Sequence, residues 1–196
     1  MKKLSTYLFL ILFSFSAPSF ADDIRDFKIE GMSIGDSLLD YFTKEYIKNK
    51  LRESVYPNQN EIHHVFLLNE PTFNIYEGIQ VHVRTNDEKF IIIGIDGFIY
   101  FADNFKGCKK KMKEIALELN NTFNFNEETS SKGTHPGDKT GKSKWSRISF
   151  FLKTSSPYAE IEIICYDNSK EFVYVDKLSI TFYGEEYKKF LNNYYK

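Results

Sequence analysis

Four histidines are the side chains best suited to acid–base or metal chemistry in this sequence: His63, His64, His82 and His135. If His64 and His82 lie on neighbouring strands, they would form a zinc site together with an Asp or Glu. The sequence has no His-Glu-x-x-His motif and no paired Cys/His spacing that would support such a site. Histidines on the solvent-facing side of a strand are the commoner case, so we predict no metal site.

The segment Pro136 to Ser143, PGDKTGKS, differs from the phosphate-binding loop motif only at its first position, where Pro replaces Gly. That motif binds phosphate because a glycine-rich loop between a strand and a helix directs backbone N–H groups at the ligand. Here a polar stretch precedes the segment, and a strand-like stretch from Ser146 to Phe151 follows it. We therefore interpret the segment as a solvent-exposed loop and predict no cofactor.

No residue has the sequence context of a catalytic nucleophile either. The one Gly-x-Ser-x-Gly match, Gly31 to Gly35, is interpreted as a helix start capped by Ser33 and not as a nucleophile elbow. Cys108 lies on an apolar helix stripe, whereas reactive thiols are exposed and have electropositive neighbours. Four lysines between Lys109 and Lys113 would suit an anionic lipid or glycan, although such a run is more often the solvated face of a helix. We predict no catalytic residue.

The two cysteines, Cys108 and Cys165, are predicted to form a disulfide. A period of 3.6 places Cys108 inward with Ile115, and a period of two places Cys165 inward with Ile163. If that helix packs on that strand, the two thiols can meet. The alternative is two separate buried thiols. An even cysteine count in an exported chain favours the bond.

The first 21 residues have the features of a secretory signal peptide. Lys2 and Lys3 form a basic start, residues 4–15 are largely apolar, and small residues lead up to Ala21. The apolar run is short for a membrane span, which needs about 20 residues. We predict cleavage after Ala21 and a periplasmic or secreted product with no transmembrane segment after cleavage.

The remainder, residues 22–196, is long enough for one domain with a buried core. Loss of Lys2 and Lys3 with the signal peptide changes the formal net charge from −1 to −3, so nothing indicates a nucleic-acid partner. The chain is rich in Lys, Asn, Ile, Phe and Tyr, which is typical of an AT-rich coding sequence. The aromatic content alone therefore does not indicate a binding surface.

Period-two alternation predicts strands in two groups. The first group covers residues 62–69, 75–84, 89–95 and 98–103, and the second covers 146–153, 159–167 and 172–183. Asp96-Gly97 lies between two apolar runs and predicts a hairpin turn, because Gly tolerates positive φ. Asn86-Asp87 predicts another turn. In the strand that contains His82, polar residues alternate with apolar ones, so one face is expected to be solvent-exposed.

Apolar residues at helical spacing predict helices that begin near Ser33, Cys108 and Glu185, and a short one over residues 44–52. Ser33 and Asp36 have the spacing of a capping box. Residues 126–144 hold almost no apolar side chain and predict a mobile polar loop. Runs of antiparallel strands with helices set apart indicate the α+β class. We expect a single antiparallel sheet with helices packed on one face, pinned by one disulfide.

Three segments carry a resemblance: GMSIGDSLLDYF (31–42), CKKKMKEIALEL (108–119) and CYDNSKE (165–171). Together they resemble an uncharacterised family of small secreted proteins from streamlined marine alphaproteobacteria. The match covers most of the mature chain, and GMSIGDSLLDY is its most specific part. No activity is known for that family, so the resemblance implies export and a single domain but no site.

Since no motif names a reaction, we predict a periplasmic, non-catalytic binding or interaction protein of unknown specificity, with an unknown envelope or periplasmic partner. The alternative is an envelope hydrolase whose carboxylates or histidines meet only in three dimensions. A deep pocket with converging polar groups would favour the enzyme. A flat exposed apolar patch or an open sheet edge would favour the binding protein.

Overall fold

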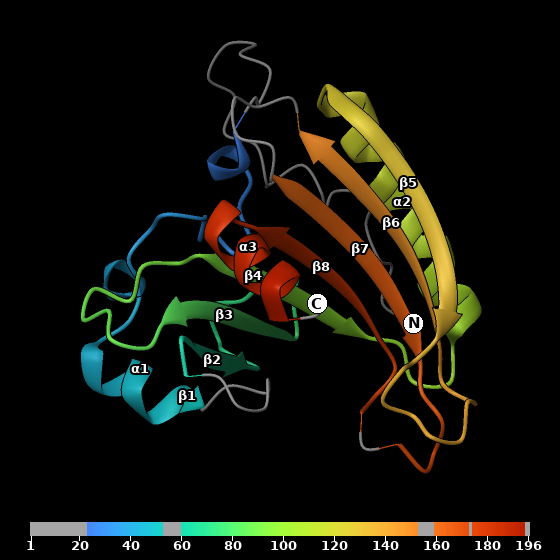
Figure 1. Cartoon of the computed structure of the whole chain (residues 1–196), viewed down its shortest axis with the longest axis horizontal. Coiled ribbons are helices and arrows are strands. Elements are labelled where there is room, and N and C mark those ends of the chain that lie inside the picture. The colour runs from blue at the N-terminus through green and yellow to red at the C-terminus, as the bar shows by residue number, and fades with distance from the viewer. Residues whose placement is uncertain (1–22, 53–59, 153–158, 173, 195–196) are drawn as a thin grey trace.

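The computed structural model describes residues 23–52, 60–152, 159–172 and 174–194 (Figure 1). They form one antiparallel sheet of eight strands in the order β1-β2-β3-β4-β8-β7-β6-β5. The strands are β1 (Leu51–Arg52), β2 (Ile62–Leu68), β3 (Gly78–Arg84), β4 (Gly94–Tyr100), β5 (Phe125–Thr134), β6 (Lys144–Leu152), β7 (Glu160–Asp167) and β8 (Lys177–Tyr183). The α-helices are α1 (Lys44–Lys50), α2 (Phe105–Thr122) and α3 (Glu185–Tyr194). The predicted α+β class with a single antiparallel sheet is confirmed.

The sheet consists of two four-stranded halves that meet at its centre. Strands β1 to β4 run from one edge inward, α2 carries the chain to the opposite edge, and β5 to β8 return to the centre. The last strand, β8, therefore pairs with β4 (Figure 1). Because of this connection, the central pair, β4 with β8, joins residues that are further apart in sequence than those of any other pair in the described sheet.

One face of the sheet is apolar and forms the core. The strand registers align Val81, Ile95, Phe182, Ile161 and Phe150 in a single row across five strands, and all five are buried. Helix α2 covers this face with its own buried stripe, which consists of Cys108, Met112, Ile115, Ala116 and Leu119. Burial of these side chains is the main favourable contribution to folding, at roughly 1.5–3 kcal/mol for each large one.

The disulfide between Cys108 and Cys165 is confirmed. Both residues are fully buried, and their Cα atoms lie 5.9 Å apart. The bond joins α2 to β7, the strand on which the helix mainly packs. The helical and strand periods of the sequence therefore identified the correct contact.

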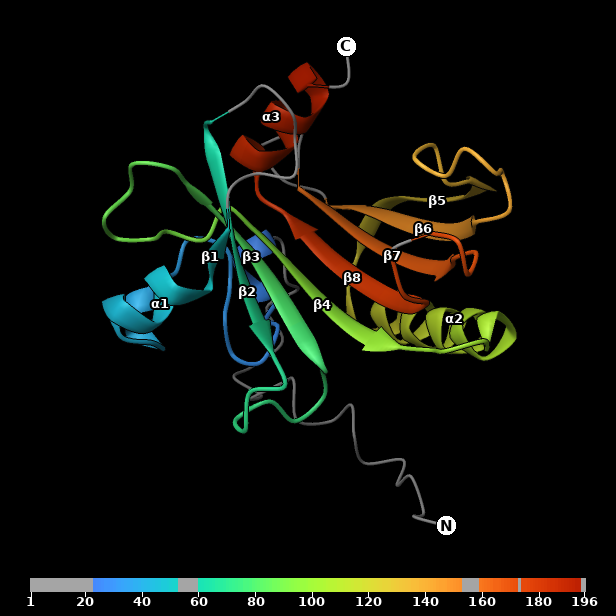
Figure 2. The ribbon, with the colours of Figure 1, turned by 90° about the horizontal axis from the view of Figure 1, so that it is seen from below.

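Helix α3 adds a cover on the other face. The expected arrangement of helices on one face describes α2, whereas α3 lies across the sheet from it (Figure 2). The ring of Tyr187 on α3 stacks on His82 of β3, with ring centroids 4.0 Å apart. Gly94 permits this approach, because a Cβ atom there would overlap the Tyr187 ring.

The first predicted helix is mostly replaced by turns. Asp36 Oδ2 accepts a hydrogen bond from Ser33 N at 2.9 Å, as in a capping box, but only a 3-10 turn, Leu38–Asp40, follows. Ser33 Oγ donates to the carbonyl oxygen of Phe27 at 2.8 Å, so this side chain ties the segment to the residues before it. An α-helix begins only at Lys44, where Thr43 accepts from the backbone N–H of Tyr46.

The hairpin turn predicted at Asp96-Gly97 is wrong, because β4 runs straight through these residues. Asp96 pairs with Thr181 in the ladder, and Gly97 pairs with Ile180. A Cβ atom at Gly97 would lie 2.6 Å from the Tyr76 ring. The glycine therefore serves a close side-chain approach and not a turn.

The loop predicted over residues 126–144 is also wrong in its first part. Strand β5 occupies Phe125–Thr134 and pairs with β6, although none of its side chains is buried. The turn is confined to residues between β5 and β6, where Asp138 accepts hydrogen bonds from Ser143 N at 2.8 Å and Thr140 N at 2.8 Å. The predicted signal peptide lies outside the described residues. No described helix is both long and apolar enough to cross a membrane.

Candidate functional site

The face of the sheet opposite α2, here called the polar face, carries most of the chemistry-bearing side chains. Strand registers place Gln80, Asp96, Thr181, Glu162 and Ser149 in one row across five strands. Thr181, Glu162 and Ser149 are each less than 5% exposed. Buried polar groups need hydrogen-bond partners, so this row must be internally satisfied.

A line of two histidines and one carboxylate lies beneath α3. His64 and His82 face each other on β2 and β3, with 2.8 Å between their Nδ1 atoms. His82 Nε2 lies 2.6 Å from Asp96 Oδ2, and Thr181 Oγ1 donates to Asp96 Oδ1. Both histidines were singled out from the sequence, but as solvent-facing residues, and that placement is wrong because both rings are buried.

Neighbouring groups shift the pKa values of this line. Gln80 Nε2 lies 2.9 Å from His64 Nδ1, so this side chain joins the same line. Burial, followed by the charge of His82, lowers the pKa of His64 to about 3. Burial by itself would raise the pKa of Asp96, but His82, Thr181 and Lys177 together have the larger, opposite effect. The pKa of Asp96 is therefore below its usual value, and the carboxylate is ionised.

The histidine line does not offer an accessible general acid or base. A catalytic acid or base must come within hydrogen-bond reach of the substrate. The side chain of His82 is 2% exposed and lies under Tyr187, and His64 is fully buried, while the Asp96 side chain is 17% exposed. Among the described residues, no group of three or more His, Cys, Asp or Glu side chains is arranged to hold a metal ion. The line therefore acts as a buried connection between β2, β3, β4 and β8.

Two buried glutamates continue the polar face on β7. Glu162 Oε1 accepts from Arg147 Nη1 at 2.9 Å, and Glu162 Oε2 accepts from Tyr183 Oη at 2.5 Å. Glu160 forms an ion pair with Lys188 of α3. Burial raises the pKa of Glu160 against the opposing Lys188 ammonium, and the charge of Glu162 adds to the rise. These contacts attach α3 to the sheet and leave both carboxylates occupied.

Beyond α3, the polar face ends in an exposed row of aromatic and cationic side chains. The registers place Tyr100, Lys177, Tyr166 and Trp145 side by side on β4, β8, β7 and β6. We call these four residues the aromatic row. Each is partly exposed, and Tyr100 is 40% exposed. Arg147, two residues further along β6, lies 5.4 Å from the centre of the Trp145 ring.

The segments next to the aromatic row add further exposed apolar surface. Tyr174 and Val175, just before β8, are 56% and 57% exposed. Phe172 and His135 pack against each other with ring centroids 4.7 Å apart, and His135 lies 6.2 Å from Tyr166. His135, one of the four histidines in the sequence, is thus part of an aromatic cluster. These residues extend the exposed aromatic surface beside the row.

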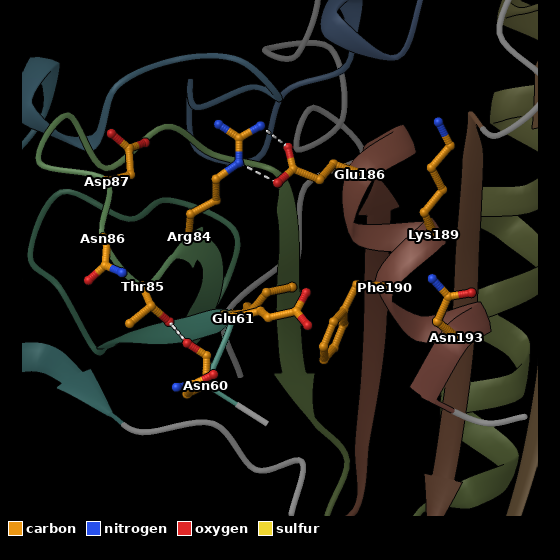
Figure 3. Close-up of a pocket in the computed structure, with 11 residues that line it drawn as sticks. Asn60, Glu61, Arg84, Thr85, Asn86, Asp87, Glu186, Lys189, Phe190 and Asn193 are labelled. Carbon is orange, nitrogen blue, oxygen red and sulfur yellow. Dashed lines mark hydrogen bonds and ion pairs between the residues drawn. The ribbon is translucent and has the colours of Figure 1, made fainter. Parts of the chain in front are cut away.

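A separate hollow of about 840 Å³ lies between α3 and the ends of β2 and β3 (Figure 3). Arg84 and Glu186 point toward each other, and the Phe190 ring projects from α3 below them (Figure 3). Its lining residues are Asn60, Glu61, Ile62, Arg84, Thr85, Asn86, Asp87, Glu186, Lys189, Phe190 and Asn193. Of these only Ile62 is buried, so the hollow is an open surface feature with no enclosed site.

The remaining sequence candidates have structural roles. Asp138, in the segment that resembles a phosphate-binding loop, uses its carboxylate to hold the turn, and hydrogen bonds from Ser143 and Thr140 lower its pKa. The lysines of α2 line its exposed side, where Lys110 and Lys111 lie 3.9 and 3.8 Å from Glu114. Sequence reasoning missed the aromatic row because its members belong to four strands. Their common position in the pleat was the only signal.

Comparisons with known proteins add no further constraint. No protein-family model matches the chain. No curated protein and no solved structure is similar to it. The family resemblance of the residue 31–42 segment therefore stays a prediction.

Proposed function

We propose that this protein is a non-catalytic binding or interaction protein and that the aromatic row is its binding surface. The observation that carries the proposal is the contrast along the polar face. Its buried part holds hydrogen bonds and ion pairs, and α3 packs on His82 and pairs with Glu160, whereas its other end presents Tyr100, Tyr166 and Trp145 with Lys177 between them. Aromatic rings give a large contact area at a small entropic cost, and cations between them add polar contacts.

The environment of the row supports the same interpretation. Lys177 Nζ lies 4.7 Å from the centre of the Phe98 ring, and burial lowers the pKa of Lys177 against the opposing charge of Asp96. The Trp145 Nε1–H donates to the carbonyl oxygen of Thr134 at 3.0 Å, which fixes the ring. A surface whose side chains are already ordered loses less entropy on binding.

The envelope hydrolase is the less favoured alternative. It would have to use the histidine line or the glutamate pair, since these are the titratable clusters described on the polar face. Tyr187 stacks on His82, and Glu160 is paired with Lys188, so α3 would have to move before a substrate reached either group. Hydrolysis of ester or glycoside substrates by the protein with α3 intact would favour the hydrolase alternative.

We also propose that the protein works in the periplasm or outside the cell. The apolar leader that ends at Ala21 motivates this, and a buried disulfide fits an oxidising compartment. N-terminal sequencing of the mature protein should give a chain that begins within a residue or two of Asp22. An intact Met1 end in a membrane pellet would contradict export.

Trp145 offers a direct test of the binding surface, because it is the only tryptophan in the sequence. Its fluorescence should shift when a ligand or partner covers the aromatic row. We would titrate the protein with fractionated envelope extract, with soluble glycans and with peptides, and follow Trp145 emission together with affinity capture of the tagged protein. The expected result is saturable binding that changes the emission.

Two variants separate the row from the rest of the surface. Tyr166→Ala should weaken the captured interaction at least tenfold, which corresponds to a central aromatic contact. Leu117→Ser, which changes a residue on α2 that is 64% exposed and lies on the other side of the sheet, should leave binding unchanged. Equal binding by wild type and Tyr166→Ala would place the binding surface elsewhere.

A further inference from the structure

Strand β5 ends the sheet and leaves one side of its backbone open. It is ten residues long, and no described strand pairs with its outer side. Helix α2 packs mainly on β7, and Asn120 near its C-terminal end donates a hydrogen bond to Glu128 of β5, so the helix lies against one face of the sheet. An exposed edge strand of this length is a template for pairing with another strand.

The residues whose backbone groups point outward follow from one hydrogen bond. His135 N donates to the carbonyl oxygen of Ser143 at 2.9 Å, next to the last pair of the β5–β6 ladder, Thr134 with Lys144. Hydrogen-bonded and non-hydrogen-bonded pairs alternate along an antiparallel ladder. The register is regular from Glu127 to Thr134, so Thr129, Ser131 and Gly133 bond to β6. The outward-pointing residues are Glu128, Ser130, Lys132 and Thr134.

The charges on this edge are self-complementary about Ser130. If two β5 strands pair antiparallel with Ser130 opposite Ser130 of the second copy, Glu128 of each copy faces Lys132 of the other. All three residues are exposed and their side chains share the face of the sheet that carries α2, where Glu128 Oε2 also accepts a hydrogen bond from Asn120 Nδ2 of that helix at 2.5 Å. Opposite charges directly across a ladder stabilise the pairing. A peptide of arbitrary sequence would lack the matching charges opposite Glu128 and Lys132, whereas a second copy of this chain supplies both. The irregularity between Phe125 and Glu127 ends the regular edge on one side.

We propose that β5 is a dimerisation edge and that its partner is a second copy of this chain, paired antiparallel about Ser130. A two-fold axis normal to the sheet would give a continuous antiparallel sheet through both copies, which is an isologous interface. Each copy would contribute the backbone N–H and C=O groups of Glu128, Ser130 and Lys132. The polar faces of the two copies would lie on the same side.

Cysteine cross-linking tests the register. Facing residues in a hydrogen-bonded pair have Cα atoms about 5.5 Å apart, which is within the range of a disulfide. Ser130→Cys should form an intermolecular disulfide rapidly under mild oxidation. Glu128→Cys alone and Lys132→Cys alone should not, but an equimolar mixture of these two variants should give the mixed dimer. Cross-linking of Glu128→Cys to itself as fast as Ser130→Cys would overturn the register.

Charge reversal and proline substitution test the interface without cysteines. The wild-type mass from light scattering should rise with concentration toward twice that of the monomer. Glu128→Lys places like charges across both symmetric contacts and should weaken dimerisation about tenfold. The swap Glu128→Lys with Lys132→Glu should restore it. Ser130→Pro should give a folded monomer, since the Ser130 N–H points away from β6.

Several results would reject the proposal. A wild-type protein that stays monomeric at all concentrations, while capturing an extended peptide on the same edge, would make β5 a peptide-binding edge. A dimer that persists in both Ser130→Pro and Glu128→Lys would lie on another surface. Circular dichroism of each variant against wild type separates lost pairing from lost folding.

Discussion

Removal of the Cys108–Cys165 disulfide should lower the free energy of unfolding by about 4 kcal/mol. The bond closes a loop with a sequence separation of 57 residues. In the chain-entropy description, the loop-closure cost removed from the unfolded state is 2.1 plus 1.5R ln n cal/mol/K, which gives about 4 kcal/mol at 25 °C for a loop of this length. Since a loss of 1 kcal/mol lowers the melting temperature of a protein this size by about 2–4 °C, we expect a decrease of about 10 °C.

Urea unfolding of the oxidised and the reduced protein measures this difference. The dependence of the unfolding free energy on urea should also become steeper after reduction, because the unfolded chain without the cross-link exposes more surface. The double variant Cys108→Ala with Cys165→Ala is the control, since its stability should not respond to the reductant. A loss below about 1 kcal/mol, or an equal response of the control, would refute the loop-closure reasoning.

Three further predictions concern the polar face and the turn after β5. Gly94→Ala should destabilise the protein by about 1–3 kcal/mol in urea unfolding, because the added Cβ displaces Tyr187 from His82. Gly137→Ala, where a Cβ would meet its nearest neighbour at 3.4 Å, should change stability much less. Stability should fall as the pH decreases from about 6.5 toward 3, by at most about 1.4 kcal/mol per pH unit from His64, because the unfolded histidine binds a proton that the folded one excludes. His64→Gln should flatten that dependence in unfolding curves measured at several pH values, and an unchanged slope would contradict the argument. Asp138→Ala should speed amide hydrogen exchange at Thr140 and Ser143, whose N–H groups donate to the Asp138 carboxylate, while exchange within β7 stays unchanged.

The contact between α2 and β7 was predictable because two independent periods pointed to it. Cys108 and Ile115 follow the helical period, and Cys165 and Ile163 follow the strand period. Burial of an apolar stripe is a local pattern that survives in the sequence. The disulfide then required only that the two buried stripes face each other.

The misassignments arose where tertiary contacts overrule local preference. Asp96-Gly97 has the composition of a turn, but His82 and Thr181 bind the carboxylate and Tyr76 occupies the space beside the glycine. Strand β5 has almost no apolar residues, so its strand conformation depends on the ladder with β6.

For the candidate functional residues too, the histidines and the aromatic row, the local sequence does not predict the tertiary surroundings. Alternation correctly separated His82 from its apolar neighbours, but no local pattern states that α3, about a hundred residues later, covers it. The aromatic row depends on the registers of four strands, and register is a property of the whole sheet.

The position of β8 in the middle of the sheet has a consequence for how the chain matures. All other strands precede it in the sequence, so until residues 177–183 emerge, β4 and β7 each end in an unpaired, largely apolar edge. A chain that is made or translocated from its N-terminus holds two incomplete half-sheets during that interval, and unpaired strand edges favour aggregation. Both cysteines emerge before β8, which allows the Cys108–Cys165 bond to hold α2 against β7 while the gap is still open. Closure then couples the two halves in one late step, so a chain truncated before Tyr183 should fail as a whole instead of losing only its last strand.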